Sequence, residues 1–174
     1  MSVAFTKEED SESNAANLPD RPISAHPNLV TAEGLAALDA ALAEARAAYA
    51  AAQSGGAVSS DRTAMARATR DLRYYSARRA NAQLVPPGDD AEKVSFGGAV
   101  TFEREDGRRQ TFRIVGEDEA DPAKGAVSYV SPLAQALLGR KVGDVAMVAG
   151  AEVEVTGVSI PSPLAGEGVG GADG

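Results

Sequence analysis

The spacing of apolar residues changes once along this chain, and that change limits the possible folds more than any other feature. Between Thr31 and Gln53 the spacing alternates between three and four residues, at Leu35, Leu38, Leu42, Ala45, Tyr49 and Ala52. From Val94 onward apolar and polar residues alternate instead. The first spacing is typical of a helix with a heptad seam, and the second is typical of strands. The sequence therefore predicts an α+β protein whose helices precede its strands.

A second helix is predicted from about Asp61 to Leu84, because the break at residues 54–56 is followed by a new helical period and Pro86 ends it. Two consecutive helices with a short break between them most simply form an antiparallel coiled-coil hairpin, here over residues 29–85. Each arm of about 22 residues would be roughly 33 Å long.

Residues 94–160 predict an antiparallel β-sheet with one short helix packed across it. A hairpin of strands turns at Asp106 and Gly107, and a third strand is expected over 127–130. Ser131 and Pro132 are suited to the N-cap and first position of the helix. The last two strands are expected over 145–148 and 153–160, where apolar residues recur around Gly150.

The two ends of the chain are predicted to be disordered. Residues 1–28 are rich in polar residues and proline without any apolar period, and residues 161–174 are mostly Gly, Ala and Pro. The 174 residues include no cysteine, so disulfides and thiolate metal sites are not expected. No apolar run approaches the roughly 20 residues that a membrane helix needs, so we expect no membrane partner and a cytoplasmic location.

Charge is unevenly distributed along the chain. The formal net charge is -8, which argues against a free nucleic-acid-binding protein. The predicted second helix nevertheless has six arginines against two aspartates, at Arg62, Arg67, Arg70, Arg73, Arg78 and Arg79. These arginines either form a solvated helix face or bind a partner that presents phosphate or carboxylate groups.

Two motifs in the C-terminal part are specific enough to indicate a family. The segments FRIVGEDEA, at 112–120, and SPLAQALLGRKVGD, at 131–144, resemble the C-terminal domain of the Gre transcript-cleavage factors, and the likeness extends over about 94–160. The start of the predicted hairpin, LVTAEGLAALDAAL at 29–42, is similar to the N-terminal opening of that family, and RDLRYYSARRANAQL at 70–84 resembles the end of its second coiled-coil helix.

The resemblance implies a coiled-coil hairpin followed by an FKBP-like domain. In that family the FKBP-like domain docks on the rim of bacterial RNA polymerase and the hairpin enters the secondary channel. Docking residues would match Ser131 and Pro132 here, with Val130 where the family commonly has an acid. Arg70 and Arg73 are candidates for contact with nascent RNA or with acidic channel walls, and Asp61 is a third candidate for a contact in the channel.

The family's hairpin tip has two carboxylates that help to hold a catalytic Mg²⁺ of the polymerase, and this chain departs from that pattern. Its tip, from Ala51 to Thr63, has Asp61 as its only carboxylate. Asp61 is more simply explained as a first-turn residue of the second helix, where the helix dipole favours an acid. The hairpin is also shorter than the family's. We therefore expect a polymerase-binding factor with weak or no cleavage stimulation, no enzyme activity of its own, and no cofactor or metal of its own.

Four alternatives remain at this stage. The short hairpin with a non-acidic tip also fits an Rnk-type regulator that competes with Gre factors for polymerase. A genuine cleavage-stimulating factor is the second alternative, and a homodimeric adaptor that pairs through its hairpin is a third, although we expect a monomer. A prolyl isomerase, the fourth, is disfavoured because the FKBP-like fold does not imply that activity and the few aromatic residues are scattered.

Overall fold

The computed structural model describes residues 18–55 and 59–161. The chain divides into two compact units. Unit 1 comprises Met1–Asn28 and Leu35–Gln83, and unit 2 comprises Leu29–Gly34 and Leu84–Gly174. The predicted domain boundary assigned residues 29–34 to the hairpin, whereas the structure groups them with the β-rich part.

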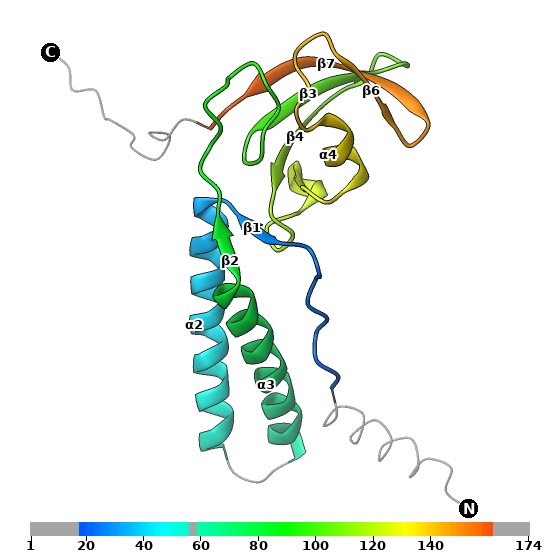
Figure 1. Cartoon of the computed structure of the whole chain (residues 1–174). Coiled ribbons are helices and arrows are strands. Elements are labelled where there is room, and N and C mark those ends of the chain that lie inside the picture. The colour runs from blue at the N-terminus through cyan, green and yellow to red at the C-terminus, as the bar shows by residue number, and fades with distance from the viewer. Residues whose placement is uncertain (1–17, 56–58, 162–174) are drawn as a thin grey trace, which may run out of the picture. The chain divides into compact units, whose positions relative to one another are not determined.

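Unit 1 contains two helices that lie side by side and run in opposite directions (Figure 1). They are α2 (Ala32–Ser54), whose first turn belongs to unit 2, and α3 (Ser59–Ala80). The apolar side chains that are buried in these helices are Leu38, Leu42 and Ala45 of the predicted α2 seam, and Ala68 of α3. Both helices thus overlap the ranges that the sequence predicts, while knobs-into-holes packing of a coiled coil stays a prediction.

The second helix ends earlier than the sequence predicts. α3 stops at Ala80, and the next residues form strand β2 (Ala82–Leu84), which pairs with β1 (Asn28–Val30) in a two-stranded sheet. The Val85 N–H extends this pairing by donating to the Val30 carbonyl at 2.9 Å. Because Val85 precedes Pro86, its backbone is biased toward extended conformations, and β1 offers a pairing edge that helical periodicity does not reveal.

Most of the two ends predicted to be disordered, residues 1–17 and 162–174, lie outside the described residues. Residues 18–27 form no helix or strand, but they are not free of contacts. Within unit 1, Asp20 forms an ion pair with Arg73 and Arg21 forms one with Asp71. The segment therefore contacts α3 through charged side chains, a type of contact that a search for apolar periods does not detect.

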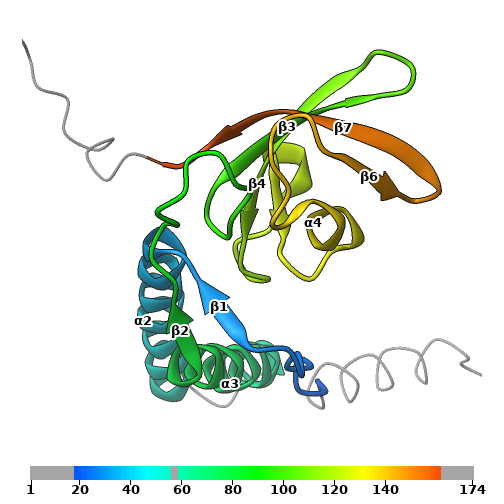
Figure 2. The same ribbon diagram turned by 45° about the horizontal axis from the view of Figure 1, so that its top comes forward.

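Unit 2 is built on a curled five-stranded sheet in the order β5-β4-β3-β7-β6 (Figures 1 and 2). Its strands are β3 (Ala99–Arg104), β4 (Arg109–Val115), β5 (Ala126–Ser128), β6 (Val145–Val148) and β7 (Ala151–Ser159). The β3–β4 hairpin turns at Gly107, which has a φ of 84°, and the β6–β7 hairpin turns at Ala149 and Gly150, with φ of 51° and 82°. In the β6–β7 hairpin both central residues have positive φ, which matches the twist of a tight hairpin.

The sheet is mixed, so the prediction of a fully antiparallel sheet was wrong. β5 pairs parallel to β4, with Ile114 opposite Val127, while the other neighbours are antiparallel. Residues 116–125 make this possible, because they carry the chain back through a short 3-10 helix (Pro122–Lys124) until Ala126 lies opposite Arg113, in the second half of β4. A parallel pair needs such a crossover connection, whereas the prediction assumed a direct return.

The core of unit 2 lies between one face of the sheet and the short helix α4 (Pro132–Leu137), which the sheet curls around in Figure 2. Phe102, Ile114, Leu137 and Val155 are completely buried there. Gly139, with a φ of 83°, follows the C-cap of α4, as the sequence predicts. None of the helices in the described part of the chain is long and apolar enough to span a membrane.

Candidate functional site

The start of α4 brings together the three residues predicted to dock on a partner. Ser131 is the N-cap: its Oγ accepts a hydrogen bond from the Ala134 N–H at 3.2 Å. Its own N–H donates to the Ser128 carbonyl, and the Val130 N–H donates to the Ser128 Oγ at 3.3 Å. These bonds fix one turn between β5 and α4. Because the Ser131 Oγ already serves as the cap, its role in the fold is structural.

Pro132 is the exposed member of this turn, whereas Val130 and Ser131 are half-buried. Behind it, Ala134 and Leu137 are completely buried and anchor the helix on the sheet. The turn therefore presents a rigid proline ring to solvent, since its backbone is held by the cap and its helix by the core. A preorganised apolar group of this kind suits a docking contact.

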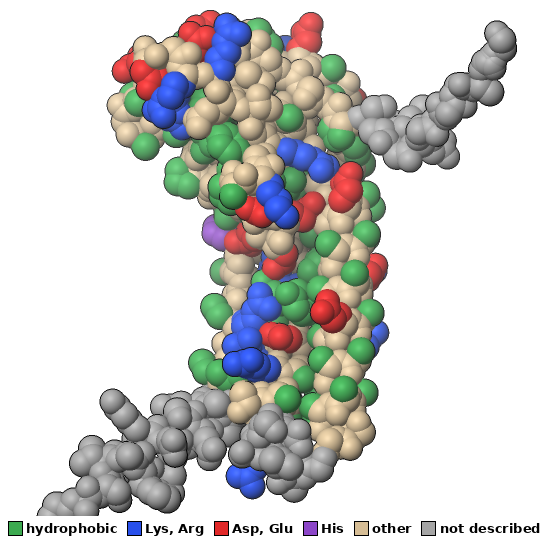
Figure 3. Space-filling model, turned by 180° about the vertical axis from the view of Figure 1, so that it is seen from behind, with side chains coloured by type: hydrophobic (Ala, Val, Ile, Leu, Met, Phe, Trp, Pro, Cys, Tyr) green, Lys and Arg blue, Asp and Glu red, His purple; other side chains and the backbone are tan. Residues whose placement is uncertain are grey.

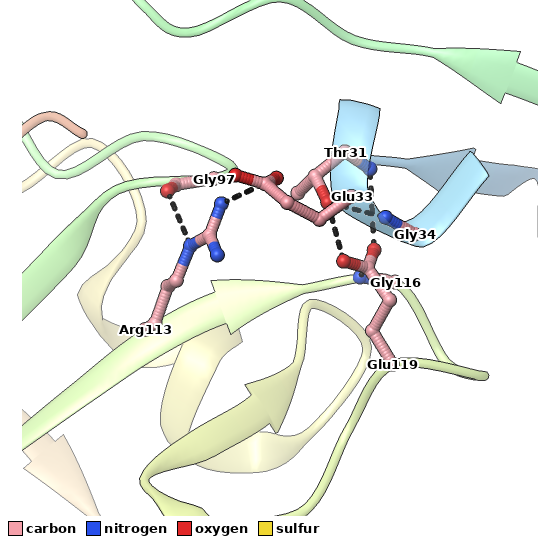
Figure 4. Close-up of polar contacts among 7 residues, drawn as sticks. All are labelled: Thr31, Glu33, Gly34, Gly97, Arg113, Gly116 and Glu119. Atoms are coloured by element: carbon pink, nitrogen blue, oxygen red, sulfur yellow. Dashed lines mark hydrogen bonds and ion pairs between the residues drawn. The ribbon is translucent and has the colours of Figure 1, made fainter. Parts of the chain in front are cut away.

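Residues 116–120, the GEDEA end of the FRIVGEDEA motif, also belong to unit 2 and have a structural role that the sequence did not reveal. The Glu119 carboxylate accepts hydrogen bonds from the Thr31 N–H at 3.2 Å, the Gly116 N–H at 3.3 Å and the Thr31 hydroxyl (Figure 4). Thr31 Oγ1 in turn accepts from the Gly34 N–H at 3.0 Å, so Thr31 caps the start of α2. The motif thus holds residues 29–34 within unit 2.

Two glycines allow this close contact. A Cβ on Gly116 would lie 2.3 Å from the Leu29 carbonyl oxygen, and one on Gly34 would lie 2.1 Å from Cδ of Glu119. Any other residue at Gly116 would force backbone atoms apart. The sequence shows both glycines but not what they contact, because each lies against a residue more than eighty positions away.

A second ion pair lies beside this cluster. Arg113 of β4 donates from one guanidinium nitrogen to the Glu33 carboxylate at 3.0 Å and from Nε to the Gly97 carbonyl at 3.0 Å (Figure 4). The backbone N–H of Glu33 and then the Arg113 guanidinium hold the pKa of Glu33 below its ordinary value. Glu33 is exposed, so solvent screens this pair and its effect on stability is small.

The arginines of α3 do not form one continuous basic surface. Arg70 pairs with Asp71 at 3.4 Å, Arg73 with Asp20 at 3.2 Å, and Arg79 with Asp39. Figure 3 shows basic side chains next to acidic ones over the helices of unit 1. Arg78 is buried. The candidates Arg70 and Arg73 are therefore close to acidic side chains, although Arg73 remains 67% exposed.

Arg78 is buried and hydrogen-bonded to Asn28, the first residue of β1. Its NH2 group donates to Asn28 Oδ1 at 2.7 Å, and Asn28 Nδ2 donates to the Arg78 carbonyl at 2.7 Å. Nothing in the local sequence distinguishes Arg78 from the other five arginines of α3. The bond from NH2 to Asn28 Oδ1 offsets part of the cost of burying this guanidinium, which is 1% exposed.

The hairpin tip is only partly described. Residues 56–58 lie outside the described residues, and α3 begins at Ser59, which places Asp61 in its first turn. That position agrees with the helix-dipole explanation of Asp61, whose side chain is not among those described. Within residues 18–55 and 59–161, no group of three or more His, Cys, Asp or Glu side chains is arranged to hold a metal ion.

Comparison with known proteins identifies the C-terminal domain. Residues 89–160 match the family model described as "Transcription elongation factor, GreA/GreB, C-term". The transcription elongation factor GreA of Desulfovibrio desulfuricans is 44% identical over 75 residues, which cover 42% of this chain and 46% of that protein. GreB of Neisseria meningitidis serogroup B is 40% identical over 77 residues, 43% of this chain and 47% of that protein. The chain thus matches about half the length of these relatives.

Solved structures cover more of the chain at lower identity. Gfh1 of Thermus aquaticus aligns with 78% of this chain and 99% of its own, at 23% identity and a TM-score of 0.37. A GreA/GreB protein of Nitrosomonas europaea aligns with 75% of this chain and 98% of its own, at 17% identity and a TM-score of 0.36.

Proposed function

We propose that this protein is a Gre-family factor, on the match of residues 89–160, and that it binds bacterial RNA polymerase at its secondary channel and regulates transcription elongation. The observation that carries this proposal is the turn at Val130–Pro132. It lies in the matched domain, its backbone is fixed by the Ser131 cap, and it presents Pro132 to solvent. We assign the docking contact to Pro132 and Val130, with Ser131 holding them in place.

The helices of unit 1 are the part that would enter the channel. α2 and α3 contain 23 and 22 residues, so each is about 34 Å long at 1.5 Å per residue. Arg70 and Arg73 lie halfway along α3, and guanidinium groups bind phosphate oxygens in a bidentate manner. In the polymerase complex we assign these two arginines to phosphates of the nascent RNA.

We further propose that this factor stimulates transcript cleavage weakly or not at all. A second catalytic Mg²⁺ needs additional oxygen ligands, and carboxylates are the usual protein source. Between Ala51 and Thr63 the only carboxylate is Asp61. The protein supplies no catalytic group of its own, so any cleavage would be performed by the polymerase with its own Mg²⁺.

A cleavage assay on backtracked elongation complexes tests the second proposal. With Mg²⁺ and purified protein, we expect little cleavage above the intrinsic rate of the polymerase. Added together with an authentic GreA protein, the chain should reduce GreA-stimulated cleavage by occupying the same channel. Strong cleavage by this protein alone would contradict our interpretation of its tip and leave it as an ordinary cleavage factor.

Affinity for core RNA polymerase tests the docking contact. We expect Pro132→Ala to weaken binding by about tenfold, because a few central contacts usually dominate an interface. Pro122→Ala is the matched control, since Pro122 is also exposed and also begins a short helix in unit 2. Equal loss with both variants would show that the turn at α4 has no special role, and absence of binding by the unmodified protein would refute the proposed function.

A further inference from the structure

Arg21 lies on a pair of tyrosines in the middle of α3, a contact that the proposed function does not use. Its guanidinium carbon is 3.8 Å from the ring centre of Tyr74 and 5.2 Å from that of Tyr75. The two rings meet edge to face, with centres 5.2 Å apart and planes inclined at 81°. A guanidinium at this distance over a tyrosine ring is held by a cation–π interaction.

Ion pairs add to this contact on either side. Arg21 lies 3.7 Å from a carboxylate oxygen of Asp71, and the preceding residue, Asp20, lies 3.2 Å from a guanidinium nitrogen of Arg73. Neighbouring residues of the leader thus each meet an opposite charge on α3. A side-chain hydrogen bond to Tyr75 also raises the pKa of Arg21. The contact therefore involves four α3 side chains: Asp71, Arg73, Tyr74 and Tyr75.

Asp20 occupies the position that a phosphate would take on Arg73. Both groups are anionic oxygen acceptors, and a guanidinium that is paired with a carboxylate must lose that partner before it binds phosphate in the same way. The pairing is exposed, with 63% of the Asp20 and 67% of the Arg73 side chain accessible to solvent. Exposed ion pairs and cation–π contacts are each weak, so the strap is held closed by little energy and is easily displaced.

We propose that Asp20 and Arg21 form an intramolecular strap that competes with the phosphate backbone of single-stranded RNA for Arg73 of α3. This inference rests on the proposed function for its biological setting, since the RNA in question is the transcript inside the polymerase. The strap lowers the affinity of the free protein for polyanions. It opens when a phosphate of the bound RNA replaces Asp20 on Arg73.

The decisive experiment measures the affinity of the purified full chain for a fluorescent single-stranded RNA oligonucleotide at low ionic strength, without polymerase. Arg21→Ala removes a positive charge, so general electrostatics predicts weaker RNA binding. The strap predicts the opposite. RNA affinity should rise about threefold to tenfold, because a larger fraction of the molecules then has the strap open and Arg73 accessible to phosphate. The matched control is Arg46→Ala on α2, an exposed arginine, which should leave binding unchanged or weaken it.

A second pair of variants isolates Arg73. Asp20→Asn should also increase RNA affinity, and by more than Glu44→Gln, which removes one negative charge from an exposed position on α2. The gain from Arg21→Ala should disappear when Arg73→Ala is added. The proposal is overturned if Arg21→Ala binds RNA no more tightly than the unmodified protein, or if none of these proteins binds RNA. Since polymerase is absent from this assay, its result is independent of the docking test on Pro132.

Discussion

Unit 2 buries large apolar side chains completely, whereas unit 1 packs two helices through alanines and a few leucines. Phe102, Ile114 and Leu137 have no accessible surface in unit 2. The most deeply buried large side chain of unit 1 is Arg78, at 1% exposure. Unit 2 is therefore stabilised mainly by apolar burial, whereas unit 1 also depends on polar pairing near the start of β1.

Removing a buried aromatic side chain from unit 2 should reduce stability more than any other change proposed below. Phe102→Ala should lower the free energy of unfolding of this unit by about 3–5 kcal/mol, because it removes buried surface and leaves a cavity. Hydrogen exchange read peptide by peptide measures the loss for each unit separately. Met147→Ala, at a side chain that is 58% exposed, is the control and should change little. Comparable losses in both variants would show that burial does not determine the stability of unit 2.

The corresponding test in unit 1 removes a polar partner instead. Asn28→Ala deprives buried Arg78 of two hydrogen bonds, one that its guanidinium donates and one that its backbone carbonyl accepts. We expect unit 1 to lose about 2 kcal/mol, the usual cost of leaving a buried polar group unsatisfied, with faster exchange in α2 and α3. Gln83→Ala, an exposed residue of β2, should be neutral. No difference between the two variants would contradict the importance of this pairing.

A smaller effect is expected where a cap and a carboxylate meet in unit 2. Thr31→Val keeps the shape of the side chain but loses its bonds to Glu119 and to the Gly34 N–H. We expect a loss of about 1–2 kcal/mol from the missing helix cap and hydrogen bond. Thr31→Ser should retain most of the stability because it keeps the hydroxyl. Denaturant unfolding followed by circular dichroism measures both, and equal losses would rule out the hydroxyl as the cause.

The smallest effect is pH-dependent. The pKa of Glu33 is lower in the folded protein than in the unfolded chain, so its ionised form stabilises the fold above the unfolded pKa, and this contribution is lost as the pH falls through the folded pKa. Glu33→Gln should therefore cost a few tenths of a kcal/mol at pH 7, a small value because solvent screens the pair. The difference from the unmodified protein should be smaller at about pH 3, which lies below the roughly 4.3 of an unfolded glutamate, because part of the ionised form is then lost. Thermal unfolding at both pH values measures it, and a difference that grows in acid would contradict the assigned pKa direction.

The sequence predicted the elements of unit 2 well wherever a residue has only one suitable local role. Ser131 with Pro132 gave the start of α4, Gly139 gave its end, and Gly107 gave a hairpin turn, because capping and positive φ depend on neighbouring residues alone. The parallel pairing of β5 with β4 was missed, since strand direction depends on where the connecting residues 116–125 go. The same limitation hid β2, whose partner lies more than fifty residues earlier.

The candidate site was predicted in part. Val130, Ser131 and Pro132 came from a resemblance between motifs, and the structure places them in a single turn. The arginines of α3 were predicted only as a group. Which of them is buried, which is paired with the leader and which is exposed depends on Asn28, Asp20 and Asp39, and nothing in the local sequence links those residues to α3.

The sequence by itself therefore determined the order of helices and strands, the ends of several elements and the family of residues 89–160. These follow from side-chain periodicity, capping and short motifs, which act over a few residues. Only the tertiary structure decided the mixed sheet, the Glu119–Thr31 contact and the strap of Arg21 on Tyr74. Each of these joins residues at least 13 positions apart, beyond the few residues over which capping and periodicity act, so they depend on how the chain folds back on itself.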